Sequence, residues 1–215
     1  MNVSELVVYI AYLIPITLSI LIVYSILVAK KSVLKYTIIG YLVTCLVFDL
    51  LGTLLGKLYA NNLILIPFFG LIELIWFSAT YYYLTQKKFC LYLAIPTFIL
   101  FIYEMFTVDF NNVQNFQTYT RFVSTLSLIT LALFYCYLLL KTNWKNYNFY
   151  LFLFNATLLV YASFSCLYYL PINLLINWSS EFKFWFWLLN ITITLIFYIL
   201  NTKVLCNLGK TKIHS

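Results

Sequence analysis

The sequence has few of the residue types on which enzyme active sites depend. It contains one histidine, His214, and only six acidic side chains in 215 residues. A single histidine cannot supply an HExxH zinc site, a pair of haem ligands or a Ser-His-Asp triad. The GxSxG, P-loop and GxGxxG patterns are also missing from the sequence. We therefore expect a protein that is not an enzyme, with no catalytic residues, no metal site and no cofactor.

Charge is scarce, whereas apolar residues are abundant. Charged residues make up 9% of the chain and hydrophobic residues 64%, against about 25% charged residues in a soluble domain. A transmembrane helix needs about 20 mostly apolar residues. Such stretches cover residues 6–28, 36–55, 63–84, 89–106, 122–140, 149–170 and 184–201. The sequence predicts an all-α polytopic membrane helix bundle of about seven transmembrane helices. We expect one domain over residues 1–208 and a short basic cytosolic tail over 209–215.

The basic residues fall mainly in alternate connections between these stretches. One side receives Lys30, Lys31, Lys35, Lys87, Lys88, Lys141, Lys145, Lys203, Lys210 and Lys212, and the other only Lys57, Arg121 and Lys183. Cytoplasmic connections of membrane proteins are enriched in Lys and Arg. The pattern predicts an external N-terminus and a cytosolic C-terminus, in a bacterial inner membrane.

Some of these lysines also form a candidate partner face. The clustered members are Lys30, Lys31, Lys87, Lys88, Lys141 and Lys145. Besides topology and attraction to the lipid bilayer, they could contact an acidic cytosolic partner, either a protein or a ribonucleoprotein.

Two acids fall well inside predicted spans. Asp49 and Glu73 lie roughly 9 Å and 15 Å from the outer end at about 1.5 Å per residue. An acid at the centre of a membrane helix costs about 2.5–3.5 kcal/mol, so it requires a partner or a use. We expect Glu73 to point into the bundle. Glu104 and Arg121 lie at the outer ends of their stretches, so the four charges could converge on one outward-opening polar pocket. The alternative is a structural network with a hydrogen-bonded Glu73 and a Glu104–Arg121 pair.

Three further features concern contacts between helices. Asn155 and Asn190 are expected to hydrogen-bond between helices, and Asn190 is also a candidate pocket residue. Gly52 and Gly56 form a GxxxG pattern, which favours close backbone approach and here suggests a homo-oligomer. The aromatic residues, 21% of the chain, gather near the predicted span ends and are interpreted as an interfacial belt.

Short local stretches carry a resemblance to known proteins. The stretches Leu71–Leu74 around Glu73, Tyr119–Arg121 and Leu188–Asn190 resemble small, aromatic-rich, multi-pass bacterial membrane proteins without assigned chemistry. In size, class and basic inner face, the chain is similar to the membrane accessory protein of type VI-B CRISPR loci. That resemblance implies a non-enzymatic modulator of an RNA-guided RNA nuclease in antiviral defence.

The alternative function is a small outward-facing transporter, channel or sensor that uses the buried acidic pocket. A continuous polar path past Glu73 would favour transport, and a closed, fully paired network would favour the accessory function.

Overall fold

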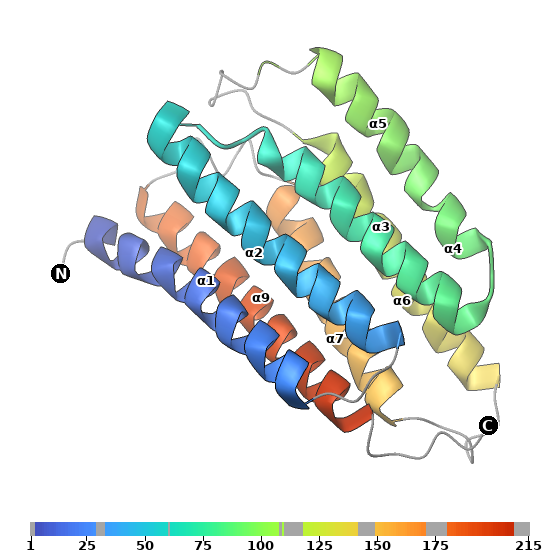
Figure 1. Cartoon of the computed structure of the whole chain (residues 1–215). Helices are drawn as coiled ribbons and strands as arrows, with labels where there is room; N and C mark the ends of the chain where they lie inside the picture. Colours follow the sequence, from blue (N-terminus) through green and yellow to red (C-terminus); the bar gives the residue numbers. More distant parts are fainter. Residues whose placement is uncertain are drawn as a thin grey trace.

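The chain folds as a bundle of α-helices. The computed structural model describes residues 3–28, 33–59, 61–107, 109, 118–141, 149–170 and 180–208, and these are helical apart from short turns and loop residues. The helices are α1 (Val3–Val28), α2 (Val33–Tyr59), α3 (Leu65–Thr85), α4 (Phe89–Tyr92), α5 (Ala94–Thr107), α6 (Tyr119–Lys141), α7 (Phe149–Tyr169) and α9 (Ser180–Leu208) (Figure 1). The all-α prediction is confirmed.

In the part of the chain that the structure describes, six segments are long and apolar enough to cross a membrane. They are α2, α3, α4 together with α5, α6, α7 and α9. The remaining helix, α1, contributes a shorter apolar stretch, Tyr12–Val28, within its 26 residues. The protein is therefore a multi-pass membrane bundle. The orientation of its termini stays a prediction.

The predicted boundaries hold to within a few residues, with two informative differences. The stretch over 89–106 is broken at Leu93 into α4 and α5. Pro96 lacks the N–H that would bond to the carbonyl of Tyr92, which accounts for the break. Helix α9 continues seven residues beyond the predicted end at Asn201. The polar residues Asn201 and Thr202, which ended the apolar run in the sequence, are buried in the bundle.

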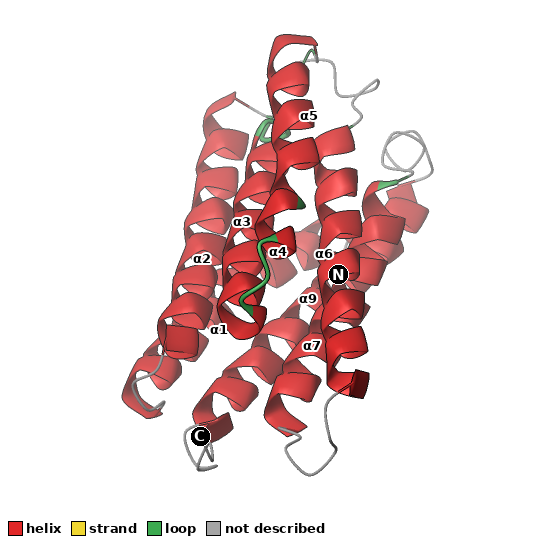
Figure 2. Cartoon of the chain, turned by 90° about the vertical axis from the view of Figure 1, so that its right-hand side faces the viewer, coloured by secondary structure: helices red, strands yellow, loops and turns green. Residues whose placement is uncertain are grey.

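Helix α6 lies at the centre of the packing, against α3 and α7. Helix α9 packs on α7 and α1, and α1 packs on α2. Figure 2 shows the long helices running side by side. We call the end with the Asn61–Ile64 connection the outer end and the end with the Gln86–Lys88 connection the inner end, after the predicted orientation.

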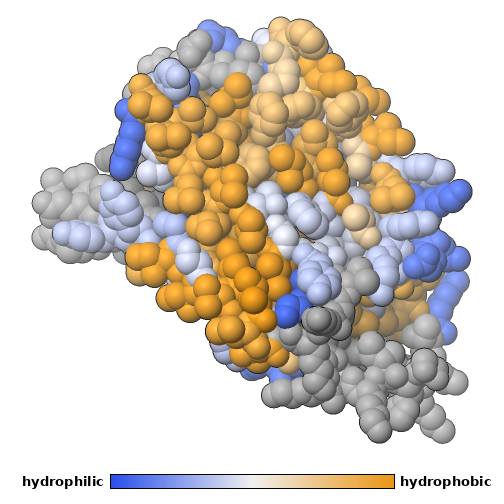
Figure 3. Space-filling model, viewed as in Figure 1, coloured by the Kyte–Doolittle hydropathy of each residue, from blue (hydrophilic) through white to orange (hydrophobic). Residues whose placement is uncertain are grey.

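The exterior of the bundle is apolar and part of its interior is polar. Large apolar side chains are exposed along the helices, among them Leu27, Phe106 and Leu140 at more than 70%. Figure 3 shows apolar residues covering most of the helix faces in view. The buried side chains include Glu73, Arg121 and Asn155. Lipid can cover the apolar exterior but offers polar side chains no partners, so this distribution fits a bilayer.

Candidate functional site

A buried ion pair joins α3 to α6 in the outer half of the bundle. Nη1 of Arg121 lies 2.5 Å from Oε2 of Glu73, and the two side chains are 2% and 0% exposed. Glu73 therefore points into the bundle, as predicted. Its partner differs from the expected one, because Arg121 pairs with Glu73 rather than with Glu104.

Two tyrosines complete the hydrogen bonding of Glu73. The hydroxyls of Tyr41 in α2 and Tyr161 in α7 each donate to Oε1 of Glu73 at 2.7 Å. The Tyr161 hydroxyl also accepts from Nη2 of Arg121 at 3.2 Å. Its ring is stacked on Phe197 of α9, with ring centroids 4.3 Å apart. Both carboxylate oxygens thus have partners, and the network links four helices and contacts a fifth.

Close packing of α3 on α6 brings Arg121 to this position. A Cβ added at Gly70 would lie only 3.2 Å from Cα of Arg121, so glycine permits the approach. The guanidinium carbon lies 4.9 Å from the ring centroids of both Phe69 and Tyr169, within the range of cation–π contacts. Nε of Arg121 is buried and has no hydrogen-bond partner among the described residues.

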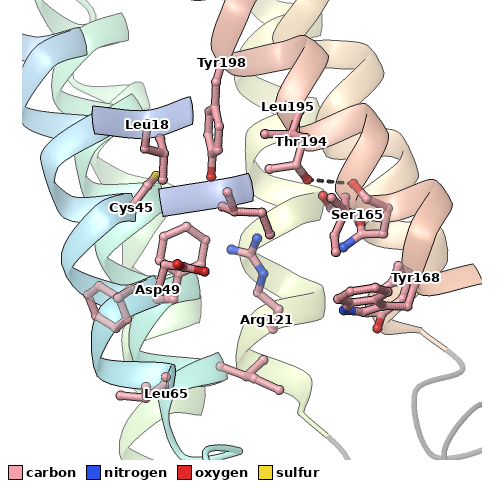
Figure 4. A pocket seen from close by; sticks show the side chains of 18 of the residues that line it. Leu18, Cys45, Asp49, Leu65, Arg121, Ser165, Tyr168, Thr194, Leu195 and Tyr198 are labelled. Carbon is pink, nitrogen blue, oxygen red and sulfur yellow. Dashed lines mark hydrogen bonds between the residues drawn. The ribbon is translucent and has the colours of Figure 1, made fainter. Parts of the chain in front are cut away.

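A cavity of about 500 Å³ lies beside this network. Its walls come from α1, α2, α3, α6, α7 and α9 and from Asn62. Its polar side chains include Asp49, Thr53, Asn62, Arg121, Ser165, Asn190 and Thr194. Figure 4 shows the Asp49 carboxylate and the Arg121 guanidinium turned towards the same space between the helices. This volume is within the range of small-molecule binding sites, about 300–1,000 Å³.

The cavity extends from the outer half of the bundle to its middle. Its deepest lining residue on α2 is Cys45, and its deepest on α9 is Tyr198. Farther towards the inner end the core is filled by side chains that are at most 4% exposed: Leu42, Phe77, Leu128, Phe154, Leu158 and Leu205. The cavity is therefore closed on the inner side in this conformation.

Of the four charges expected to converge on one pocket, the structure brings two to the cavity and a third next to it. Asp49 and Arg121 line the cavity, and Glu73 lies behind Arg121. Glu104 lies elsewhere. Its carboxylate accepts from the backbone N–H of Thr120 at 2.8 Å and from that of Tyr119. The free N–H groups at the start of α6 attract an acid from α5, because a helix N-terminus carries partial positive charge.

The predicted interhelical role of Asn155 is confirmed. Its Oδ1 accepts from Tyr81 in α3 at 2.5 Å, and its Nδ2 donates to the carbonyl of Ala132 in α6 at 3.1 Å. Asn190 instead contributes to the cavity wall.

Among the described residues, the GxxxG pattern makes no close helix contact. A Cβ at Gly56 would meet no atom within 4 Å, and one at Gly52 would meet only the side chains of Asn62 and Leu65. A homo-oligomer through Gly52 and Gly56 stays a prediction.

Half of the predicted lysine face can be located. Lys87, Lys88 and Lys141 are exposed at the inner end. Lys30, Lys31 and Lys145, and the predicted tail over 209–215, lie outside the described residues.

Sequence reasoning missed the tyrosines of the network. Tyr41 and Tyr161 were not assigned a role, since most aromatic residues were attributed to the interfacial belt. Tyr161 lies in the middle of its predicted span, far from either interface, and this position is a signal that a belt cannot explain. The partner of its hydroxyl could not be identified without the helix packing.

The comparisons with known proteins leave the site to be interpreted from its own geometry. No family matches the chain, and searches of curated proteins and of solved structures found no similar protein. Among the described residues, no three His, Cys, Asp or Glu side chains gather into a group that could hold a metal ion.

Proposed function

We propose that this protein is a membrane-embedded receptor that binds a small ligand in its outer cavity and does not catalyse a reaction. The observation that carries the proposal is a cavity of about 500 Å³, walled by several helices and lined by the buried Arg121 and by Asp49. Such concave sites, with a few polar groups among aromatic walls, are typical of ligand binding.

The core below the cavity is closed, which disfavours a channel. The accessory function would lead us to expect a fully paired polar network, but Nε of Arg121 and Oδ2 of Asp49 have no hydrogen-bond partner among the described residues. These open groups favour a receptor. Glu73 is paired on both oxygens, and large buried side chains fill the core below the cavity. A transporter would require a second conformation that opens this core. A receptor requires only that ligand binding changes the packing of helices that reach the inner end, and α9 and α7 both line the cavity and extend there.

Cysteine accessibility tests this function with two threonines of one helix. Thr194 lines the cavity, whereas Thr202, eight residues closer to the inner end, is buried at 2% exposure. In a background without native cysteines, Thr194→Cys should react in intact cells with a membrane-impermeant cationic methanethiosulfonate. Thr202→Cys should not. Reaction at both positions would favour the transporter or channel, and reaction at neither would contradict an externally accessible site.

A second candidate function, binding of a cytosolic partner, is based on the exposed lysines at the inner end. Lys87, Lys88, Lys141 and Lys203 are exposed there, and no described acidic side chain lies at that end. Such a surface suits an acidic cytosolic partner. This is the face that an accessory protein of a CRISPR nuclease would use. That role, and the location in a bacterial inner membrane, stay predictions.

The accessory function has its own test. The double substitution Lys87→Gln with Lys88→Gln should abolish co-purification with the product of a neighbouring nuclease gene, whereas Asp49→Asn should not affect it. The reverse result, loss with Asp49→Asn alone, would assign the effect to the cavity.

A further inference from the structure

One residue sets the net charge of the described cavity lining. Arg121 is already neutralised by Glu73, since their charged atoms are 2.5 Å apart. Of the other described residues that line the cavity, Asp49 alone carries a formal charge. Fully ionised, the site therefore has one unit of negative charge, at a depth where an uncompensated charge is unfavourable.

Two polar atoms at the cavity have no partner among the described residues. One is Oδ2 of Asp49, a hydrogen-bond acceptor, and the other is Nε of Arg121, a donor. Arg121 is 2% exposed, so water reaches its side chain poorly. A buried polar group without a partner costs about 1–3 kcal/mol. A ligand that satisfies both atoms would recover this cost.

Neighbouring hydrogen-bond donors at the cavity already have backbone partners. The hydroxyl of Thr53 donates to the backbone carbonyl of Asp49 at 3.0 Å, and Nδ2 of Asn62 donates to the carbonyl of Gly52 at 3.2 Å. The hydroxyl of Thr194 donates to the carbonyl of Asn190 at 2.8 Å (Figure 4). These three donor groups are engaged with the backbone instead of with the Asp49 carboxylate.

Aromatic rings make up much of the remaining wall. Phe48, Phe69, Tyr168, Trp187 and Tyr198 all line the cavity. The face of an aromatic ring attracts cations and disfavours anions. The aromatic walls and the Asp49 carboxylate thus both favour a positively charged ligand.

We infer that the cavity binds an organic monocation, a protonated amine with an apolar or aromatic body. The ammonium group pairs with Oδ2 of Asp49, and a neutral acceptor on the same molecule receives the N–H of Nε of Arg121. A zwitterion would leave the negative charge of the site uncompensated, and an anion would double it. This assignment rests on the proposed binding function.

Four probes that share one skeleton and differ in charge provide the test. They are tyramine, the zwitterion tyrosine, the neutral alcohol tyrosol and the anion 4-hydroxyphenylpropionate. Binding to the full-length protein is measured at neutral pH in phosphatidylglycerol nanodiscs, by calorimetry and by the shift in unfolding temperature. Tyramine should bind tightest. Asp49→Asn should weaken the affinity for tyramine by about tenfold or more. The variant should then bind tyramine about as weakly as it binds tyrosol.

The controls separate this assignment from the proposed function. Asp109→Asn makes the same chemical change at an exposed acid outside the cavity, so it should leave tyramine binding unchanged. Thr194→Trp fills the cavity and should abolish the binding of every probe. If tyrosol or the anion binds as well as tyramine, and Thr194→Trp removes that binding, the cavity is a binding site but the amine assignment is wrong.

Failure of all four probes would also overturn the amine assignment, and the accessibility of Thr194→Cys then decides the proposed function separately.

The amine could be free or could belong to a lipid headgroup. Nanodiscs that contain phosphatidylethanolamine distinguish these sources, because competition with tyramine occurs only if the headgroup enters the same cavity.

Discussion

Arg121 of α6 and Glu73 of α3 form an ion pair of 2.5 Å in which neither side chain is more than 2% exposed. Glu73 also accepts hydrogen bonds from Tyr41 and Tyr161. The pair is therefore a structural link between helices, and its arginine also lines the cavity.

Removal of Arg121 should destabilise the protein strongly. Arg121→Gln leaves a buried carboxylate without its counter-charge, and breaking a buried pair costs about 3–5 kcal/mol. Because the remaining charge causes much of that cost, Glu73→Gln added to Arg121→Gln should restore part of the stability. The free energy of unfolding, from SDS titration in detergent, measures each step of the cycle. Strict additivity of the two substitutions would contradict the pairing.

Loss of either tyrosine hydroxyl should have a smaller effect. Tyr161→Phe and Tyr41→Phe each remove a hydrogen bond to a charged group, which is worth about 1.5–3 kcal/mol. The same titration applies. Tyr92→Phe is the matched control, since Tyr92 is 59% exposed and its substitution should change stability by less than about 0.5 kcal/mol.

The two glycines Gly70 and Gly56 should respond oppositely to alanine. A Cβ at Gly70 would lie 3.0 Å from Cδ of Arg121 and 3.2 Å from its Cα, so Gly70→Ala should cost about 1–3 kcal/mol. Around Gly56 there is open space. Gly56→Ala should be neutral or stabilise the helix by up to about 1 kcal/mol.

The same Gly56→Ala variant tests the predicted homo-oligomer. If Gly52 and Gly56 mediate self-association, the substitution should shift the protein towards monomer in crosslinking and light-scattering measurements. An unchanged oligomeric state would remove the GxxxG pattern as an interface.

The orientation can be tested at two exposed residues. Asp109 lies at the outer end and Lys88 at the inner end. In a cysteine-free background, Asp109→Cys should react with an impermeant maleimide in intact cells, and Lys88→Cys should react only after permeabilisation. The opposite pattern would invert the predicted topology.

The sequence alone predicted the helices and most of their ends. Long apolar runs and the avoidance of charge are properties of the chain in one dimension, so a transmembrane helix can be recognised without its neighbours. The two main boundary errors, at Leu93 and beyond Asn201, came from a proline and from polar residues that tertiary packing buries.

The sequence also showed that Asp49 and Glu73 lie at membrane depth, because each falls inside an apolar run and an acid there is costly. It could not assign their partners. Contacts between side chains depend on how each helix is rotated and which helix lies beside it. The close approach at Gly70 brings Arg121 to Glu73. The free N–H groups at the start of α6 bind Glu104 instead. Only the tertiary structure therefore decided that one acid is paired, one stabilises a helix end, and Asp49 faces the cavity with an unpartnered oxygen.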